Sequence, residues 1–223
     1  MEIKKIILSL VFFSLIFTYP LNYKIKYFGI YVADCKISNI DTTYKQSDTK
    51  KITFSVKTKP FFKYLFPVDN NYVIILDKNN KIVFFSKKTF QPKVENFIET
   101  EIREGIVFYQ NSDLKIPKDS YNIFSLLYSI MDNKIPKKEF ILEKEGMIYN
   151  ASINSIDSNI YDLTINGLEG SDNKTLIQNT DIFTWGIFLK NTKRRFIIDV
   201  KSGLINKCFF KRGIVTIKAE LDN

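Results

Sequence analysis

Acidic side chains are the first candidates for chemistry in this sequence. Glu95, Glu99, Glu101 and Glu104 lie on one predicted hairpin, and strand alternation would place Glu99 and Glu101 on the same face. Paired carboxylates can hydrolyse glycosides, although clustered charges are more often a solvated face. No serine-nucleophile motif, phosphate-binding glycine loop or metal-ligand spacing accompanies them. The chain also has no histidine, so we predict a protein that is not an enzyme and binds no metal or cofactor.

Basic side chains are the second group. Lys and Arg total 33 against 24 Asp and Glu, which gives a formal net charge of +9. The densest cluster, Lys193-Arg194-Arg195, is predicted to lie in an exposed turn. It is either a solvated turn or a contact for anionic headgroups at a membrane surface. The other basic residues are spread thinly and form no nucleic-acid-binding motif, so we expect no nucleic acid partner.

Apolar side chains are the third group, because aromatic residues make up 15% of the chain, with 20 Phe and 12 Tyr. They gather in a first strand that is apolar on both faces, in a segment between two prolines, and on one helix. They are either ordinary core or the lining of an apolar cavity inside a curved sheet. The candidate ligand-binding side chains are Phe28, Ile30, Val32, Phe61, Phe62, Phe124 and Leu127.

Two cysteines complete the set of reactive side chains. Cys35 falls in the first predicted strand and Cys208 in the penultimate one. If the sheet curls so that its first and last strands meet, a Cys35–Cys208 disulfide could form in an oxidising compartment. The alternative is two buried free thiols.

The elements that must position these groups are mostly short strands. Alternating segments separated by turn residues recur along the chain, which is typical of an antiparallel β sandwich or barrel. A long first strand is predicted over 23–39, with a bend at Gly29. Segment 60–67 is predicted to be irregular or a short helical crossover, and strands are predicted over 176–181 and 183–190.

One helix interrupts the strands. Apolar residues recur at helical spacing over 119–131, and Asp119 or Ser120 can cap its start. A helix this apolar must be buried on most sides. The sequence therefore predicts a mainly β protein, an antiparallel meander forming a strongly curved sheet, half-barrel or barrel, with one packed helix near 119–131.

The first residues have the pattern of an export signal. Two lysines precede the apolar run 6–17, which is short for a membrane-spanning helix, and no small-residue cleavage site follows. We predict that 1–18 is a signal peptide or an uncleaved N-terminal anchor and that 19–223 is a single β domain. The protein is then periplasmic or secreted, either free or tethered to the cytoplasmic membrane by 6–17.

Three segments together resemble the bacterial family called domain of unknown function 3108. They are the extended stretch 23–30, the helix 119–128, and the segment 188–198 with Arg194-Arg195. The family's usual second glycine, arginine and proline are replaced here by Ala33-Asp34, Met131-Asp132 and Phe196. The resemblance spans roughly 23–221. It implies an antiparallel β protein of the cell envelope and supplies no activity, because the role of that family is undefined.

Three functions remain as hypotheses. The first is an exported, non-catalytic binding protein for an apolar or lipid-like ligand. The second is a structural or interaction protein of the envelope, with a filled core and an envelope protein as partner. The third, ranked last, is a carboxylate-only hydrolase. A continuous apolar cavity favours the first, a solid core the second, and two acids facing each other across a cleft the third.

Overall fold

The computed structural model describes residues 20–134, 136, 139–167 and 175–222. The predicted signal or anchor segment, 1–18, lies outside them. The helices are α1 (Pro60–Lys63), α2 (Ile123–Met131) and α3 (Ile182–Phe188). The strands are β1 (Leu21–Tyr27), β2 (Ile30–Tyr44), β3 (Ser47–Thr58), β4 (Asp69–Leu76), β5 (Ile82–Gln91), β6 (Val94–Arg103), β7 (Ile106–Tyr109), β8 (Tyr121–Asn122), β9 (Glu139–Lys144), β10 (Met147–Asp157), β11 (Ile160–Gly167), β12 (Lys193–Ile198), β13 (Ile205–Arg212) and β14 (Val215–Leu221).

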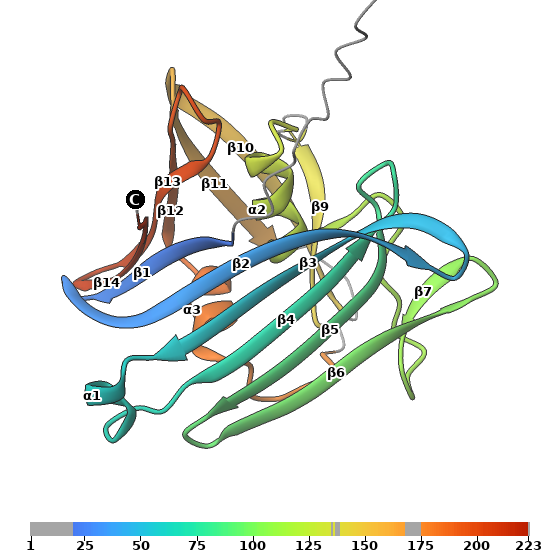
Figure 1. The fold of residues 1–223 in the computed structure, drawn as a ribbon, viewed down its shortest axis with the longest axis horizontal. Helices are drawn as coiled ribbons and strands as arrows, with labels where there is room; N and C mark the ends of the chain where they lie inside the picture. Colours follow the sequence, from blue (N-terminus) through green and yellow to red (C-terminus); the bar gives the residue numbers. More distant parts are fainter. Residues whose placement is uncertain (1–19, 135, 137–138, 168–174, 223) are drawn as a thin grey trace, which may run out of the picture.

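All the described strands belong to one curled sheet, and β1 and β14, the first and last of them, lie at its centre. The order is β7-β6-β5-β4-β3-β2-β1-β14-β13-β12-β11-β10-β9-β8, so β1 pairs with β14 and the sheet has edges at β7 and β8. The chain therefore meanders outward from β1, crosses to the far edge, and meanders back to β14 (Figure 1). The prediction of a strongly curved antiparallel sheet is confirmed, and among the described strands the sheet stays open.

Tight hairpins connect many of the strands. Phe28-Gly29, Glu104-Gly105 and Glu145-Gly146 each place both turn residues at positive φ, the geometry of a type I′ turn. The predicted single strand over 23–39 is therefore wrong. Its Gly29 is the second residue of a two-residue turn, and β1 and β2 run antiparallel on either side of it.

The helices correct the sequence analysis in two places. α2 begins later than predicted, because Asn122 rather than Asp119 or Ser120 caps it, accepting a hydrogen bond from the backbone N–H of Ser125 at 2.8 Å. The strands predicted over 176–181 and 183–190 are wrong, since α3 occupies that region. Asp181 caps α3 by accepting from the N–H groups of Phe183 and Thr184.

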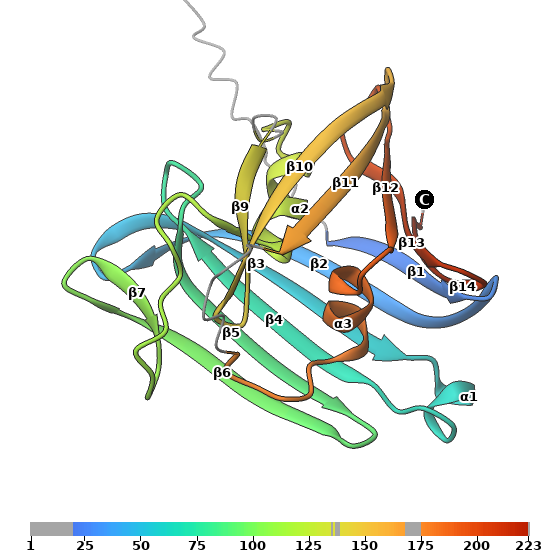
Figure 2. The ribbon, with the colours of Figure 1, turned by 180° about the vertical axis from the view of Figure 1, so that it is seen from behind.

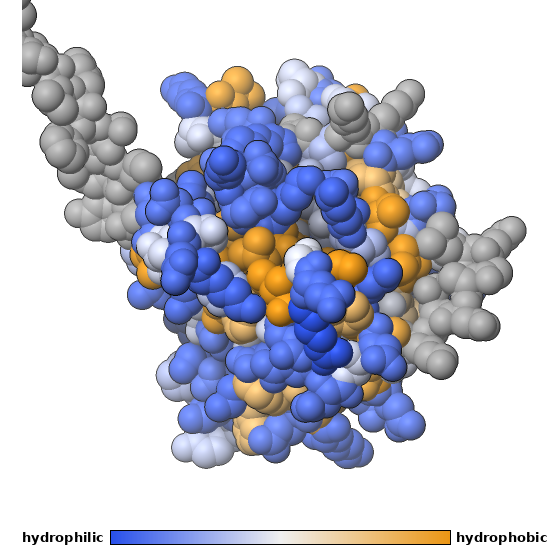
Figure 3. Space-filling model, turned by 90° about the vertical axis from the view of Figure 1, so that its right-hand side faces the viewer, coloured by the Kyte–Doolittle hydropathy of each residue, from blue (hydrophilic) through white to orange (hydrophobic). Residues whose placement is uncertain are grey.

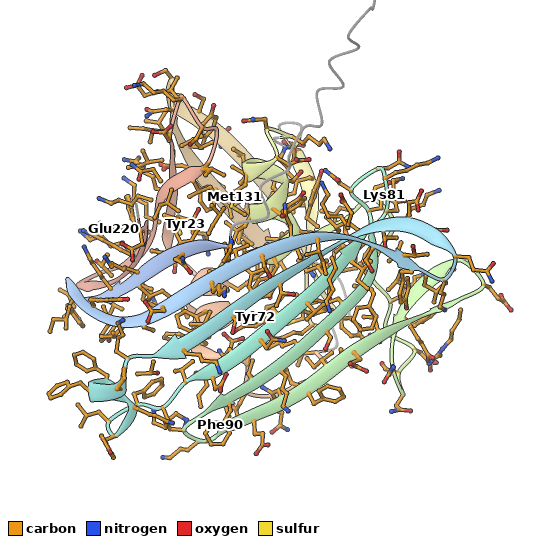
Figure 4. The ribbon with its side chains drawn as sticks, viewed as in Figure 1. Tyr23, Tyr72, Lys81, Phe90, Met131 and Glu220 are labelled. Carbon is orange, nitrogen blue, oxygen red and sulfur yellow. The ribbon has the colours of Figure 1, made fainter. Side chains whose placement is uncertain are left out.

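Two apolar clusters fill the concave side of the sheet, one against β1–β7 and one against β9–β13. α2 lies between them (Figure 2) and contacts both. Phe124 stacks on Tyr72 with ring centroids 4.1 Å apart, and Tyr23 of the central strand reaches Met131 of the helix (Figure 4). The predicted packed helix is thus confirmed, and it joins the two arms of the sheet.

The predicted disulfide is not formed. Cys35 and Cys208 are both free thiols, and β1 and β14 separate their strands. Three inter-strand spacings amount to about 14 Å along the sheet, whereas a disulfide needs Cα atoms within about 7 Å. The first and last strands do meet, but both cysteines lie one strand away from that junction. Burial raises the pKa of each thiol to about 12, which keeps both thiols unreactive.

Candidate functional site

An apolar cavity of about 470 Å³ opens at one end of the curled sheet, beside α1. Its size falls within the range of small-molecule sites. The lining comes from the β1–β2 hairpin, the segment between β3 and β4, the start of α3, and β14. It consists of Ile25, Tyr27, Phe28, Ile30, Val32, Ala33, Thr58, Phe62, Leu65, Phe66, Val68, Ile182, Phe183 and Ile217.

The polarity of this lining is low. No charged side chain belongs to it among the residues described, and its hydroxyl groups are those of Thr58 and Tyr27. The Thr58 hydroxyl donates to the carbonyl of Phe66 at 3.0 Å and accepts from the N–H of Val68 at 2.8 Å. It therefore holds the segment after β3 in place. Affinity in this cavity would come from burial of apolar surface.

The mouth of the cavity is unusually apolar on its outer side. Leu65 is 76% exposed and Ile30 57%, although both line the cavity. The side chains around α1 project beyond the end of the sheet (Figure 4). By contrast, the opposite side of the molecule carries mostly hydrophilic side chains, with an apolar area near its centre and smaller ones around it (Figure 3).

The structure divides the predicted ligand-binding residues into two groups. Phe28, Ile30, Val32 and Phe62 line the cavity. The other three do not, which corrects the prediction for them. Phe61 is 78% exposed and lies outside the lining, while Phe124 and Leu127 pack in the core where α2 joins the two clusters.

The predicted headgroup-binding turn is wrong in its placement. Lys193-Arg194-Arg195 begins β12, so its side chains alternate between the two faces. Arg194 is buried and donates to the carbonyls of Ile187, Leu189 and Thr192 at the end of α3, and burial lowers the pKa of its guanidinium to about 10. Arg195 forms two hydrogen bonds with Asp162, at 2.6 and 2.8 Å. Only Lys193 is exposed.

The acids of the 94–110 hairpin are also surface groups. Glu95 and Glu104 are exposed, and Glu99 and Glu101 are half-buried on β6. Glu101 pairs with Arg103 at 2.6 Å. This arrangement matches the solvated-face interpretation given above.

A cluster of buried charges lies on the far side of α3 from the cavity, and the sequence analysis missed it. Lys87 of β5 is 1% exposed and donates to Glu145, to Asp181 at 2.6 Å and to Thr180 at 2.8 Å. The Thr180 hydroxyl in turn donates to Glu145 at 2.6 Å. The available signal was a lysine at an inward position of β5, where alternate residues from 85 to 91 are buried.

Glu143 extends this cluster. Tyr109 donates to its carboxyl at 2.6 Å and the N–H of Gly146 does so at 2.7 Å. Burial nevertheless raises the pKa of Glu143 to about 7. The pKa of Asp181 behaves in the opposite way: burial acts to raise it, but the ion pair with Lys87 and the bonds from Thr184 hold it below its usual value.

The space beside these acids is small. Glu143, Glu145 and Asn122 line a void of about 20 Å³, and each has one buried polar atom without a hydrogen-bond partner in the described structure. Such a volume suits about one water molecule and excludes a sugar ring. Among the described residues, no group of three or more acids and cysteines could hold a metal ion.

Comparisons with known proteins do not assign this chain to a family. No family model matches the sequence, so nothing supports the resemblance to domain of unknown function 3108, and no curated protein matches it either. No helix of the described chain is long and apolar enough to cross a membrane. One solved structure that is similar is that of a β-barrel-like protein of domain of unknown function 1849 from Brucella abortus. It has 9% sequence identity and a TM-score of 0.48, over 92% of this chain and 95% of that one.

Proposed function

We propose that the protein is a non-catalytic binding protein for an apolar or lipid-like ligand, whose apolar part occupies the cavity beside α1. One observation carries the proposal: a cavity of about 470 Å³ lined almost entirely by apolar side chains. Cavities of this kind take up apolar molecules because water inside them finds few hydrogen-bonding partners.

The position of the mouth supports the proposal further. Phe28 and Leu65 are 51% and 76% exposed at the opening, so a ligand can enter without unfolding the core. A polar end of the ligand would remain at this opening, because the described residues of the inner wall include no charged side chain. Export to the envelope is part of the proposal and rests on the apolar segment 6–17, which follows two lysines.

The test is native mass spectrometry of the purified protein, with organic extraction of any molecule that co-purifies. A stoichiometric apolar adduct, or uptake of added palmitate or phosphatidylglycerol, is the expected result. A mass without adduct, combined with no uptake of either probe, would reject the proposal and favour an envelope interaction protein.

A pair of variants connects the adduct to this cavity. Val32→Phe fills part of the cavity from β2, so we expect the adduct to be lost while the melting temperature is maintained. Val200→Phe makes the same change at an exposed turn and should leave the adduct intact. If both variants retain the adduct equally, the ligand binds outside this cavity.

A further inference from the structure

Three neighbouring segments lie at the end of the sheet where the cavity opens, and together they form what we call the collar: residues 27–30, 61–66 and 212–214. The backbone holds them side by side. The N–H of Phe28 donates to the carbonyl of Thr216 at 3.3 Å, and the N–H of Lys59 donates to that of Val32 at 2.9 Å. The β1–β2 turn therefore lies between the other two, at the left-hand end of the sheet in Figure 1.

The collar exposes large apolar side chains that the cavity does not use. Tyr64 is 95% exposed, Ile214 84% and Phe61 78%, and none of them lines the cavity. A soluble surface rarely gathers so many exposed apolar groups around one opening unless it meets an apolar partner.

The conformation of the Phe28 turn is a second indication that this surface has a function. Phe28 has a φ of 49°, in the left-handed region that bulky side chains avoid. The equivalent positions of two other hairpins hold Glu104 and Glu145, with φ of 50° and 53°. The ring of Phe28 is 51% exposed at a strained hairpin tip. Stability of the fold alone does not favour an aromatic residue at this position.

The basic residues of the collar indicate an anionic partner. The chain segments that carry the collar, 24–32, 59–68 and 211–218, contain seven Lys or Arg and no Asp or Glu. Lys24, Lys26 and Lys59 pair with Asp222, Glu220 and Asp34, which lie outside these segments. Within the part of the chain that the structure describes, Lys63, Lys211 and Arg212 take part in no salt bridge.

We propose that the collar docks onto an anionic lipid bilayer, with Phe61, Tyr64 and Ile214 in the interface and Lys63, Lys211 and Arg212 against the headgroups. Apolar tips flanked by basic residues are the combination that binds such surfaces. Docking would place the cavity mouth at the membrane, so this inference extends the proposed function by naming the place where ligand is exchanged.

The experiment is co-sedimentation of the protein with vesicles of phosphatidylcholine, with and without phosphatidylglycerol. We expect binding to the anionic vesicles, weakened by added salt because the headgroup contacts are exposed. No binding to anionic vesicles, or equal binding to neutral ones, would overturn the proposal.

A matched pair of turn variants locates the contact. Ile214→Asp removes a collar residue, and Val200→Asp removes an aliphatic residue that is 77% exposed in the turn between β12 and β13. We expect Ile214→Asp to lower the partition coefficient about tenfold, from the apolar burial lost, and Val200→Asp to leave it unchanged. Equal effects of the two changes would overturn the proposal.

The two proposals can fail separately. Ile214 lies outside the cavity lining, so palmitate uptake in the absence of vesicles should be the same in Ile214→Asp and in the unchanged protein. Palmitate uptake without vesicle binding rejects docking alone. Vesicle binding without palmitate uptake rejects the cavity function and leaves docking in place.

Discussion

The two sides of α3 differ sharply. Ile182 and Phe183 face a cavity with an apolar wall and an open mouth, whereas Asp181, the preceding residue, joins a closed cluster of buried charges. On the first side few polar contacts form. On the second, Lys87 connects β5 to the start of α3 and to the β9–β10 turn. The ionic cluster thus fixes the position of the helix that forms one wall of the cavity.

This difference indicates that stability and ligand binding depend on different parts of the fold. Buried ion pairs are geometrically demanding, so they specify one arrangement of the elements they join. An apolar cavity makes few such demands and can accept ligands of different shape. Stability should therefore be most sensitive at the ionic cluster, and binding most sensitive at the collar and cavity.

The largest effect is expected for Lys87→Met. The change leaves Asp181 and Glu145 buried without their cation, and breaking such a pair costs about 3–5 kcal/mol. The free energy of unfolding, measured with urea, checks this value. Lys57→Met is the control, because Lys57 and Asp69 form an exposed pair, with side chains 64% and 57% exposed, and should lose less than about 1 kcal/mol. Equal losses of unfolding free energy in the two variants would contradict the larger role of the ionic cluster in stability.

A pH-dependent effect is expected from Glu143. Its pKa is about 7 in the folded protein against 4.5 for an ordinary glutamate side chain, so the folded state binds more protons between these values. The contribution of Glu143 to the free energy of unfolding is complete below about pH 4.5. It is lost as pH rises through 7, a decline of about 3 kcal/mol. Unfolding with urea at about pH 5 and pH 8 should show most of this decline.

Glu143→Gln should flatten this pH dependence, because an amide does not ionise and can still accept from Tyr109. Glu139→Gln, at an exposed position of the same strand, should leave the slope as it is. A slope that persists in Glu143→Gln would assign the titration to another group.

The smallest effect concerns the hairpin tip. Phe28→Asn should stabilise the protein by about 1 kcal/mol, because Asn tolerates positive φ, and should weaken palmitate binding, since Phe28 lines the cavity. Glu104→Asn relieves the same strain in the β6–β7 turn and should not alter binding. Weaker binding in both variants would attribute the loss to the relief of strain, and unchanged binding in Phe28→Asn would show that Phe28 does not contact the ligand.

The architecture followed from the sequence more closely than the individual elements did. Alternation and X-Gly turns were sufficient to predict an antiparallel curved sheet. α3 was missed because 183–188 alternates like a strand, and its helical form depends on Asp181 at one end and Arg194 at the other. Asp181 was a visible capping signal, but Arg194 comes from a strand whose place relative to α3 is set by tertiary packing.

The candidate site was predictable where neighbours in sequence are neighbours in space. Phe28, Ile30 and Val32 line the cavity because the β1–β2 hairpin forms one of its walls. Phe124 was misassigned because helical spacing shows which face is apolar and not which cluster that face meets. The ionic cluster lay beyond prediction, since Lys87 is 58 residues from Glu145 and 93 from Thr180.

The pairing of β1 with β14 also constrains how the chain folds. Lys24 and Asp222, bonded across this pair, are 198 residues apart. Contacts of such separation form slowly, because almost the whole chain must close into a loop first. Until then β1 has an unpaired edge that another chain could use as a template. A shortened chain lacking β14 would keep that edge open at the centre of its sheet, so β14 is the strand that protects β1 from aggregation.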